Sequence, residues 1–120
     1  DSILVIDDQA SYLKDNDIQR DLCDILLNRR HYKCSVILLT QTFRKMPLDI
    51  RKVLDICFIL YKPSKMDMLS MFDELFEMPK EDCVKIINTV FQKKYDNMMI
   101  EVQTQRFWRN TDELIIDDDN

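Results

Sequence analysis

Two carboxylates follow an apolar run near the start of the chain. Residues 3–6 read Ile-Leu-Val-Ile, and Asp7 and Asp8 come directly after them. Four branched aliphatic residues in a row are typical of a strand that is buried on both faces. Open α/β sheets bind ligands at the carboxyl ends of their strands, and carboxylates are preferred ligands of hard cations such as Mg²⁺. We therefore expect a buried strand whose end carries a metal site.

A second apolar run also ends in a polar side chain. Residues 34–40 are almost continuously apolar and are followed by Gln41. Between the two runs, residues 15–30 have apolar side chains at helical spacing, which predicts an amphipathic helix. A strand, a helix and a strand in this order predict a parallel pair. Gln41 should then lie beside Asp7 and Asp8 at one edge of the sheet.

The rest of the sequence continues the alternation of helices and strands. Proline at the start of two segments and a Ser64-x-x-Asp67 pattern are typical of helix starts. We expect helices at 47–54, 64–76 and 79–93, and strands at 56–61 and 98–103, the last of them at an edge of the sheet. Such alternation predicts an α/β fold with a mainly parallel sheet flanked by helices.

Composition limits the class of protein. The chain has 120 residues, of which 46% are hydrophobic, enough for one modest core. Its longest apolar runs are well short of the roughly 18 residues that a membrane span needs, so we expect no span. The four cysteines show no Cys-x-x-Cys spacing, and the chain has one histidine. This pattern predicts buried thiols in a reducing, non-secreted protein, with no zinc site or disulfide framework.

Glycine is absent from the sequence. Loops that bind phosphate need glycine, because the backbone must approach the ligand closely and adopt positive φ. The chain therefore contains no P-loop. We expect it to be a fragment that lacks an N-terminal portion, with the phosphate-binding half of any nucleotide site outside it. The net charge of -5 argues against a general nucleic-acid grip by the whole surface but allows a local basic edge.

Two classes of α/β protein hold Mg²⁺ with acids at the end of a strand. In a response-regulator receiver, Asp55 would be the phosphoacceptor, but the apolar run 56–61 follows Asp55 instead of preceding it. The Lys62-Pro63 pair also comes too early for that class. The other class is the nucleotide hydrolases, in which the acids end the Walker B strand. The same two acids could also simply end a strand and cap a helix.

The order of the motifs resembles the poxvirus-type genome-packaging ATPases of large DNA viruses, in the FtsK–HerA superfamily of P-loop motors. In that pattern an acidic Walker B strand precedes a helix, an Arg-His pair, a strand that ends in Gln, and a Pro-x-x-Ile-Arg segment. The matching residues are Asp7-Asp8, Arg30-His31, Gln41 and Pro47-Leu48-Asp49-Ile50-Arg51. The resemblance covers about residues 2–62 and beyond them rests on element order.

The resemblance implies a fold and a function. Residues 1–110 would be the C-terminal portion of a RecA-like P-loop ATPase domain, from Walker B onward and without Walker A, and residues 111–120 an acidic tail. The full-length protein would use ATP and Mg²⁺ to drive double-stranded DNA into viral capsids. It would act as a homo-oligomeric ring, expected to be a hexamer, with capsid or portal components as further partners, in the virion or the host-cell cytoplasm. The fragment alone should be inactive.

The resemblance also implies residue roles. Asp7 would bind Mg²⁺, in part through water, and Asp8 would stand where the superfamily commonly has Glu, to orient or deprotonate the attacking water. Gln41 would hydrogen-bond the water and the γ-phosphate. Arg51 or Arg30 would be an arginine finger for a neighbouring subunit's nucleotide.

Two other hypotheses remain open. The chain could be a receiver-like domain that is phosphorylated on an aspartate, or a noncatalytic α/β interaction module descended from such an ATPase. A Gly-x-x-x-x-Gly-Lys-Ser/Thr motif in the upstream sequence would favour the motor. Residues 106–109, Arg-Phe-Trp-Arg, mix cations with aromatics but are too few to favour nucleic-acid binding over edge packing.

Overall fold

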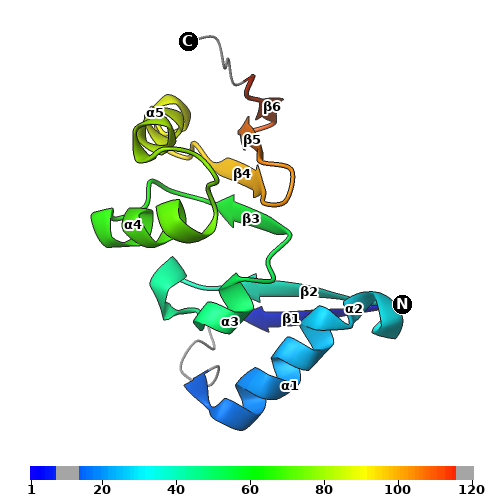
Figure 1. Cartoon of the computed structure of the whole chain (residues 1–120). Coiled ribbons are helices and arrows are strands. Elements are labelled where there is room, and N and C mark those ends of the chain that lie inside the picture. Colours follow the sequence, from blue (N-terminus) through cyan, green and yellow to red (C-terminus); the bar gives the residue numbers. More distant parts are fainter. Residues whose placement is uncertain (8–13, 116–120) are drawn as a thin grey trace. The chain divides into compact units, whose positions relative to one another are not determined.

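The structure is a computed structural model that describes residues 1–7 and 14–115 (Figure 1). The chain divides into two compact units, Asp1–Val53 and Leu54–Asn120, and each contains its own sheet. Both units combine helices with strands, and the first contains a parallel strand pair, which confirms the predicted α/β class. Asp8 and the end of the expected acidic tail lie outside the described residues.

The first unit contains a parallel strand pair, as predicted. Strand β1 (Ser2–Asp7) pairs with β2 (Cys34–Leu39) in a register that runs from Ser2 opposite Cys34 to Asp7 opposite Leu39. Helix α1 (Asn16–Leu27) and the short helix α2 (Arg29–Tyr32) lie between them in sequence. The carboxyl ends of both strands therefore meet at one edge of this small sheet.

The predicted helix at 15–30 is in fact two helices. Asp15 caps the start of α1, because its carboxylate accepts hydrogen bonds from the backbone N–H groups of Asp17 and Ile18. Asn28 caps the end of the helix, and its side-chain amide donates to the carbonyl of Asp24. Such local side-chain bonds compete with helix propagation. Lys33 then ends α2 with φ at 52°, a position that glycine usually occupies.

The prediction that the first strand is buried on both faces is wrong for the described residues. Ile3, Val5, Ile37 and Leu39 share one face of the β1–β2 pair and are 47–69% exposed. The alternate residues on the other face are partly buried. A run of aliphatic residues makes both faces of a strand apolar. Burial also requires another element that packs on each face, and the run itself does not supply one.

The segment after β2 leads through a single-turn helix to a short α-helix. The 3₁₀-helix η2 (Phe43–Lys45) precedes α3 (Leu48–Arg51), which is shorter than the predicted helix at 47–54. Phe43, Met46 and Ile50 are buried and anchor this segment. Pro47 stands at the start of α3, where its missing N–H costs nothing.

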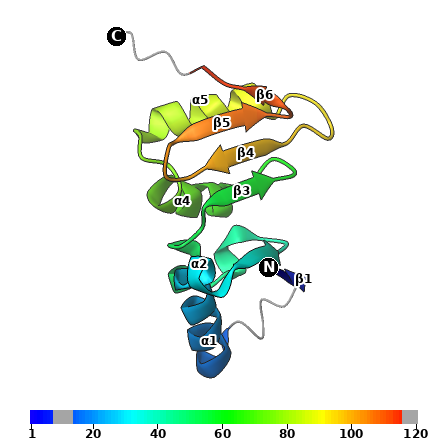
Figure 2. The ribbon, with the colours of Figure 1, turned by 90° about the vertical axis from the view of Figure 1, so that its right-hand side faces the viewer.

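The second unit contains an antiparallel sheet (Figure 2). Its order is β3 (Ile56–Ile59), β4 (Met98–Glu101), β5 (Arg106–Arg109) and β6 (Asp112–Glu113). The expected mainly parallel sheet is therefore confirmed only in the first unit.

The predicted edge position of the 98–103 strand is wrong, because β4 lies between β3 and β5. The sequence has no typical turn signal for the hairpin between β4 and β5. Its turn contains neither glycine nor proline, and Gln105 takes the left-handed conformation, with φ at 56°.

Two helices cover one face of this sheet (Figure 2). Helix α4 (Lys65–Glu74) is capped by Ser64, whose hydroxyl accepts from the N–H of Asp67 as predicted, and α5 (Lys80–Val90) follows Pro79. Both lie within the predicted ranges of 64–76 and 79–93. Buried side chains of the two helices, of the segment between them and of the strands form the core of this unit: Ile59, Met71, Leu75, Phe76, Cys83, Ile86, Ile87, Val90, Met98, Ile100 and Phe107.

None of the helices within residues 1–7 and 14–115 is both long and apolar enough to cross a membrane.

Candidate functional site

Asp7 and Gln41 lie at the carboxyl edge of the β1–β2 pair. Asp7 is the last residue of β1 and stands opposite Leu39, the last residue of β2. Gln41 follows Leu39 by two residues, and both Asp7 and Gln41 are exposed. The predicted meeting of these side chains at one sheet edge is therefore supported by the strand register. Asp8, the predicted water-orienting residue, lies outside the described residues.

A short turn positions Gln41. The hydroxyl of Thr40 donates to the carbonyl of Thr42 across 3.1 Å, which bends the chain around Gln41. Phe43 comes next and is buried. The backbone of Gln41 thus lies between the end of a strand and the buried Phe43 side chain, which reduces the backbone entropy that this segment would lose on binding a ligand.

Arg51 packs against the same aromatic anchor. Its guanidinium carbon lies 5.3 Å from the centroid of the Phe43 ring, within the range of a cation–π contact. Ile50, the preceding residue, is fully buried, and Arg51 itself is partly buried. The structure therefore connects Arg51 through Phe43 to the segment that carries Gln41.

Arg30 lies at the opposite edge of the sheet. It belongs to α2, is exposed, and comes just before the start of β2. The N–H of Ser2 donates to the carbonyl of Lys33 across 3.0 Å at this end. A six-residue strand spans about 20 Å at roughly 3.3 Å per residue. The structure therefore does not bring Arg30 to the edge that carries Asp7 in its own unit.

The carboxylate of Asp7 suits a shared magnesium site. In the described part of the chain, no three His, Cys, Asp or Glu side chains come together as a complete metal cage. Mg²⁺ in phosphate-handling sites usually takes one or two carboxylates, and phosphate oxygens and water supply the rest. An exposed aspartate at the carboxyl edge of a parallel pair fits that requirement.

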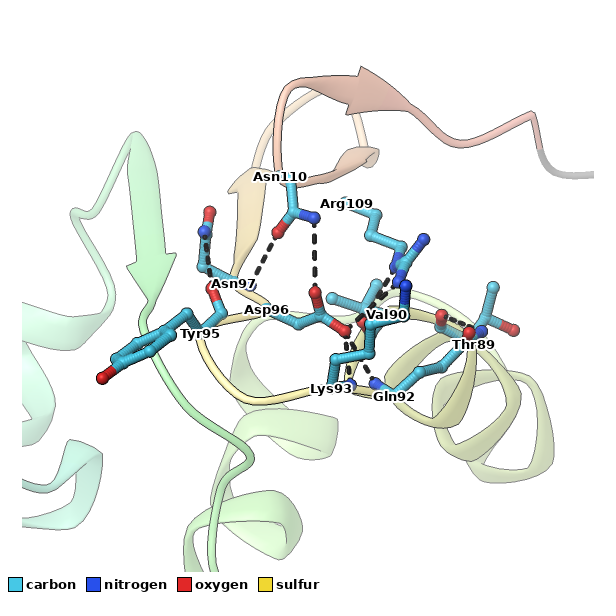
Figure 3. A network of polar contacts seen from close by, with 9 residues as sticks. All are labelled: Thr89, Val90, Gln92, Lys93, Tyr95, Asp96, Asn97, Arg109 and Asn110. Atoms are coloured by element: carbon cyan, nitrogen blue, oxygen red, sulfur yellow. Dashed lines mark hydrogen bonds and ion pairs between the residues drawn. The ribbon is translucent and has the colours of Figure 1, made fainter.

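One polar cluster in the second unit was not predicted. The buried carboxylate of Asp96 accepts hydrogen bonds from the backbone N–H groups of Gln92 and Lys93 and from the side chains of Arg109 and Asn110 (Figure 3). These bonds, above all that from the N–H of Lys93, lower the pKa of Asp96 to about 2. The partners come from the loop after α5, from β5 and from the turn that follows β5, and β5 was not among the predicted strands, so the sequence did not predict this cluster.

The strand–helix–strand unit, whose carboxyl edge carries an acid and a glutamine, has the fold of part of a P-loop-type nucleotide hydrolase. More particularly, the chain belongs to the family of the poxvirus A32 protein, whose family model matches residues 1–119. A comparison with curated proteins finds no match.

Solved structures share the fold. The DNA-packaging ATPase B204 from Sulfolobus turreted icosahedral virus has a TM-score of 0.70 and 19% identity, over 96% of this chain and 52% of that one. The genome-packaging NTPase B204 from Sulfolobus turreted icosahedral virus 2, in complex with sulfate, has a TM-score of 0.72 and 19% identity, over 95% and 55%. The structure of the same NTPase in complex with ATP-gammaS has a TM-score of 0.70 and 17% identity, over 93% of this chain and 55% of that one. The chain spans about half the length of these structures.

Proposed function

We propose that the full-length protein is an ATP-driven motor that moves double-stranded DNA into a viral capsid, and that residues 1–110 form the C-terminal portion of its ATPase domain. The observation that carries this proposal is the placement of Asp7 and Gln41 at one carboxyl edge of a parallel strand pair. Membership of the A32 family and the fold shared with packaging ATPases support it. The phosphate-binding loop would come from outside this glycine-free chain.

In this proposal the residues at the edge divide the work of hydrolysis. Asp7 would hold Mg²⁺, and the bound ion would neutralise charge on the terminal phosphates. Asp8 would orient the attacking water and accept its proton. Gln41 would donate its amide N–H to the γ-phosphate and accept a hydrogen bond from the water with its carbonyl oxygen, so its contacts would change when the phosphate leaves.

The arginine finger is proposed for Arg51 first and Arg30 second. The cation–π contact with Phe43 restrains the Arg51 guanidinium, so less entropy would be lost when it meets a phosphate. Arg30 lies a strand's length from the Asp7 edge, so it could serve only the nucleotide of a neighbouring subunit. Either role requires assembly, and we propose a homo-oligomeric ring, a hexamer, that acts on DNA with capsid or portal components in the virion or host cytoplasm.

The alternative receiver function gains no support from Asp55. Asp55 comes directly before β3, and its carbonyl accepts from the N–H of Val102 across 2.9 Å. It therefore lies at the amino end of a strand, whereas ligand-binding groups of α/β sheets stand at the carboxyl ends. The noncatalytic module is the alternative that needs an experiment.

ATP hydrolysis by the full-length protein tests the proposal. Asp8→Asn and Gln41→Ala should each lower kcat on the order of 100-fold, the usual cost of losing one transition-state contact. Gln103→Ala removes an exposed glutamine from the β4–β5 turn and should leave kcat unchanged. Turnover that is unaffected by the first two changes would show a noncatalytic module.

Mixed assemblies test the finger. Subunits with Arg51→Ala should be inactive as homo-oligomers but regain part of their activity when mixed with Asp8→Asn subunits, because an intact finger and an intact site then meet across some interfaces. Mixing Arg30→Ala subunits with Asp8→Asn subunits in the same way shows which of the two arginines is the finger. If neither mixture recovers activity, the finger does not act between subunits.

A further inference from the structure

The turn between α5 and β4 presents two cations and an aromatic ring to solvent. Lys93, Lys94 and Tyr95 follow one another and are all exposed, and Tyr95 is 81% exposed. Here the 93–97 turn means these three residues with Asp96 and Asn97. An exposed tyrosine alone is ordinary, so the significance of this turn depends on how its backbone is held.

Tyr95 is held in a conformation that its side chain disfavours. Its φ is 71°, in the left-handed region, which glycine, asparagine and aspartate adopt far more readily than a bulky residue. Such a conformation persists only where the surroundings enforce it, and it is found preferentially at functional positions.

The Asp96 carboxylate enforces the turn from one side. One of its oxygens accepts from the N–H of Gln92 at 3.0 Å, the N–H of Lys93 at 2.7 Å and the guanidinium of Arg109 at 3.2 Å (Figure 3). The N–H of Asp96 also donates to the carbonyl of Lys93 at 3.2 Å, which closes the turn.

Asn97 and Asn110 hold the turn from the other side. The side-chain amide of Asn97 donates to the carbonyl of Tyr95 at 3.3 Å, and the N–H of Asn97 donates to the side-chain oxygen of Asn110 at 3.0 Å. The N–H of Asn110 in turn donates to the carbonyl of Asn97 at 2.9 Å. With the backbone fixed on both sides, the Tyr95 ring points away from the network (Figure 3).

The exposed part of the turn is electrically positive. The Lys94 ammonium lies 5.0 Å from the centroid of the Tyr95 ring, so the two side chains form one cationic tip. The one carboxylate of the turn, Asp96, is buried and paired with Arg109. A chain of net charge -5 thus carries a local cationic site on a rigid support.

We propose that the 93–97 turn contacts the phosphate backbone of double-stranded DNA; this inference rests on the proposed packaging function. Ammonium groups bind phosphate oxygens as point charges, and the Tyr95 hydroxyl adds a hydrogen-bond donor. Contacts of this kind do not depend on the base sequence, as expected for a motor that must move a whole genome. Lys94 already lies over the Tyr95 ring, which favours backbone contact over base stacking.

Salt-dependent binding of the full-length protein to a short labelled DNA duplex tests the role of the lysines. The double variant Lys93→Ala/Lys94→Ala should weaken binding, and the slope of log K against log salt should fall by about 2, because each lost phosphate contact contributes about 0.9. The matched control, Lys65→Ala/Lys80→Ala, removes two exposed lysines of the same unit and the same total charge. It should leave the slope unchanged.

Tyr95→Asn separates a binding role from a structural one. Asparagine tolerates positive φ, so Tm should stay the same or rise, while duplex affinity falls about two- to tenfold through the loss of the hydroxyl and ring. Unchanged affinity in both turn variants, an equal loss in the lysine control, or a wild-type protein that does not bind DNA would overturn the inference. If the turn variants lose DNA binding and the wild-type protein hydrolyses no ATP, the motor function fails while the DNA contact stands.

Discussion

Phe107 is predicted to be the residue on which the stability of the second unit depends most. It is fully buried, and its ring stacks on that of Phe76 with centroids 5.4 Å apart and an interplanar angle of 8°. Replacing a buried phenylalanine with alanine typically costs about 3–5 kcal/mol, and the loss of a stacked aromatic pair places Phe107 in the upper part of that range. We therefore expect Phe107→Ala to lower the free energy of unfolding by about 4–5 kcal/mol.

Phe58 provides a control with the same chemical change in the same sheet. It lies on β3, on the face opposite to Phe107, and is 64% exposed. About a third of its surface is removed from water, so Phe58→Ala should cost about 1 kcal/mol. Alternation along β-strands thus predicts a difference of about 3–4 kcal/mol between two identical substitutions.

Urea unfolding of the chain, followed by far-UV circular dichroism, measures this difference. The midpoint should shift far more for Phe107→Ala than for Phe58→Ala, with the m-value unchanged. If Phe107→Ala does not fold, Phe107→Leu keeps much of the apolar volume and should still be less stable than Phe58→Leu. Equal costs for the two positions would refute the assigned strand register and the location of the core.

Three further predictions concern pH, capping and nucleotide binding. The pKa of Asp96 falls from 3.8 to about 2 on folding, so its contribution to stability is fully present above about pH 4 and is lost as pH falls through about 2. In measurements of Tm against pH, Asp96→Asn should remove this part of the acid transition. Ser64→Ala removes the cap of α4 and should cost about 1 kcal/mol in urea unfolding, whereas an unchanged midpoint would contradict the capping role. The isolated chain should show no ATP binding by calorimetry at micromolar concentrations, because it has no phosphate-binding loop; measurable affinity would contradict the division of the site.

Local chemistry made much of the fold predictable. The hydrophobic runs at 3–6 and 34–40 identified β1 and β2, and the helix between them fixed their parallel order. A parallel order predicts that Asp7 and Gln41 lie at one edge of the pair, and the strand register supports this. The cap at Ser64 was also predictable, because it depends on side chains three residues apart.

The unpredicted features depend on contacts between distant segments. Strand β5 begins and ends with arginine and has no hairpin signal before it, so its pairing with β4 is visible only in three dimensions. The Asp96 cluster depends on that pairing, because Arg109 and Asn110 reach it from β5 and the turn that follows. The exposure of one face of β1 and β2 likewise depends on what covers a face, which the composition of a strand does not report.

Tyr95 differs from the other described residues with positive φ in how its turn is held. A chain without glycine must place other residues where φ is positive, and four described residues do so: Lys33, Tyr95, Gln105 and Asn110. Lys33 ends a helix, and its N–H donates to the carbonyl of Arg30.

Gln105 and Asn110 secure their turns with their own side chains. The side-chain amide of Gln105 donates to the carbonyls of Leu75 and Val102, and that of Asn110 bonds Asp96 and the N–H of Asn97. Tyr95 differs, because its turn is held by the side chains of other residues and its own ring extends into solvent beside Lys94. Asparagine at this position would meet the structural need alone, so the strain at Tyr95 supports the proposed contact of its ring and hydroxyl with DNA.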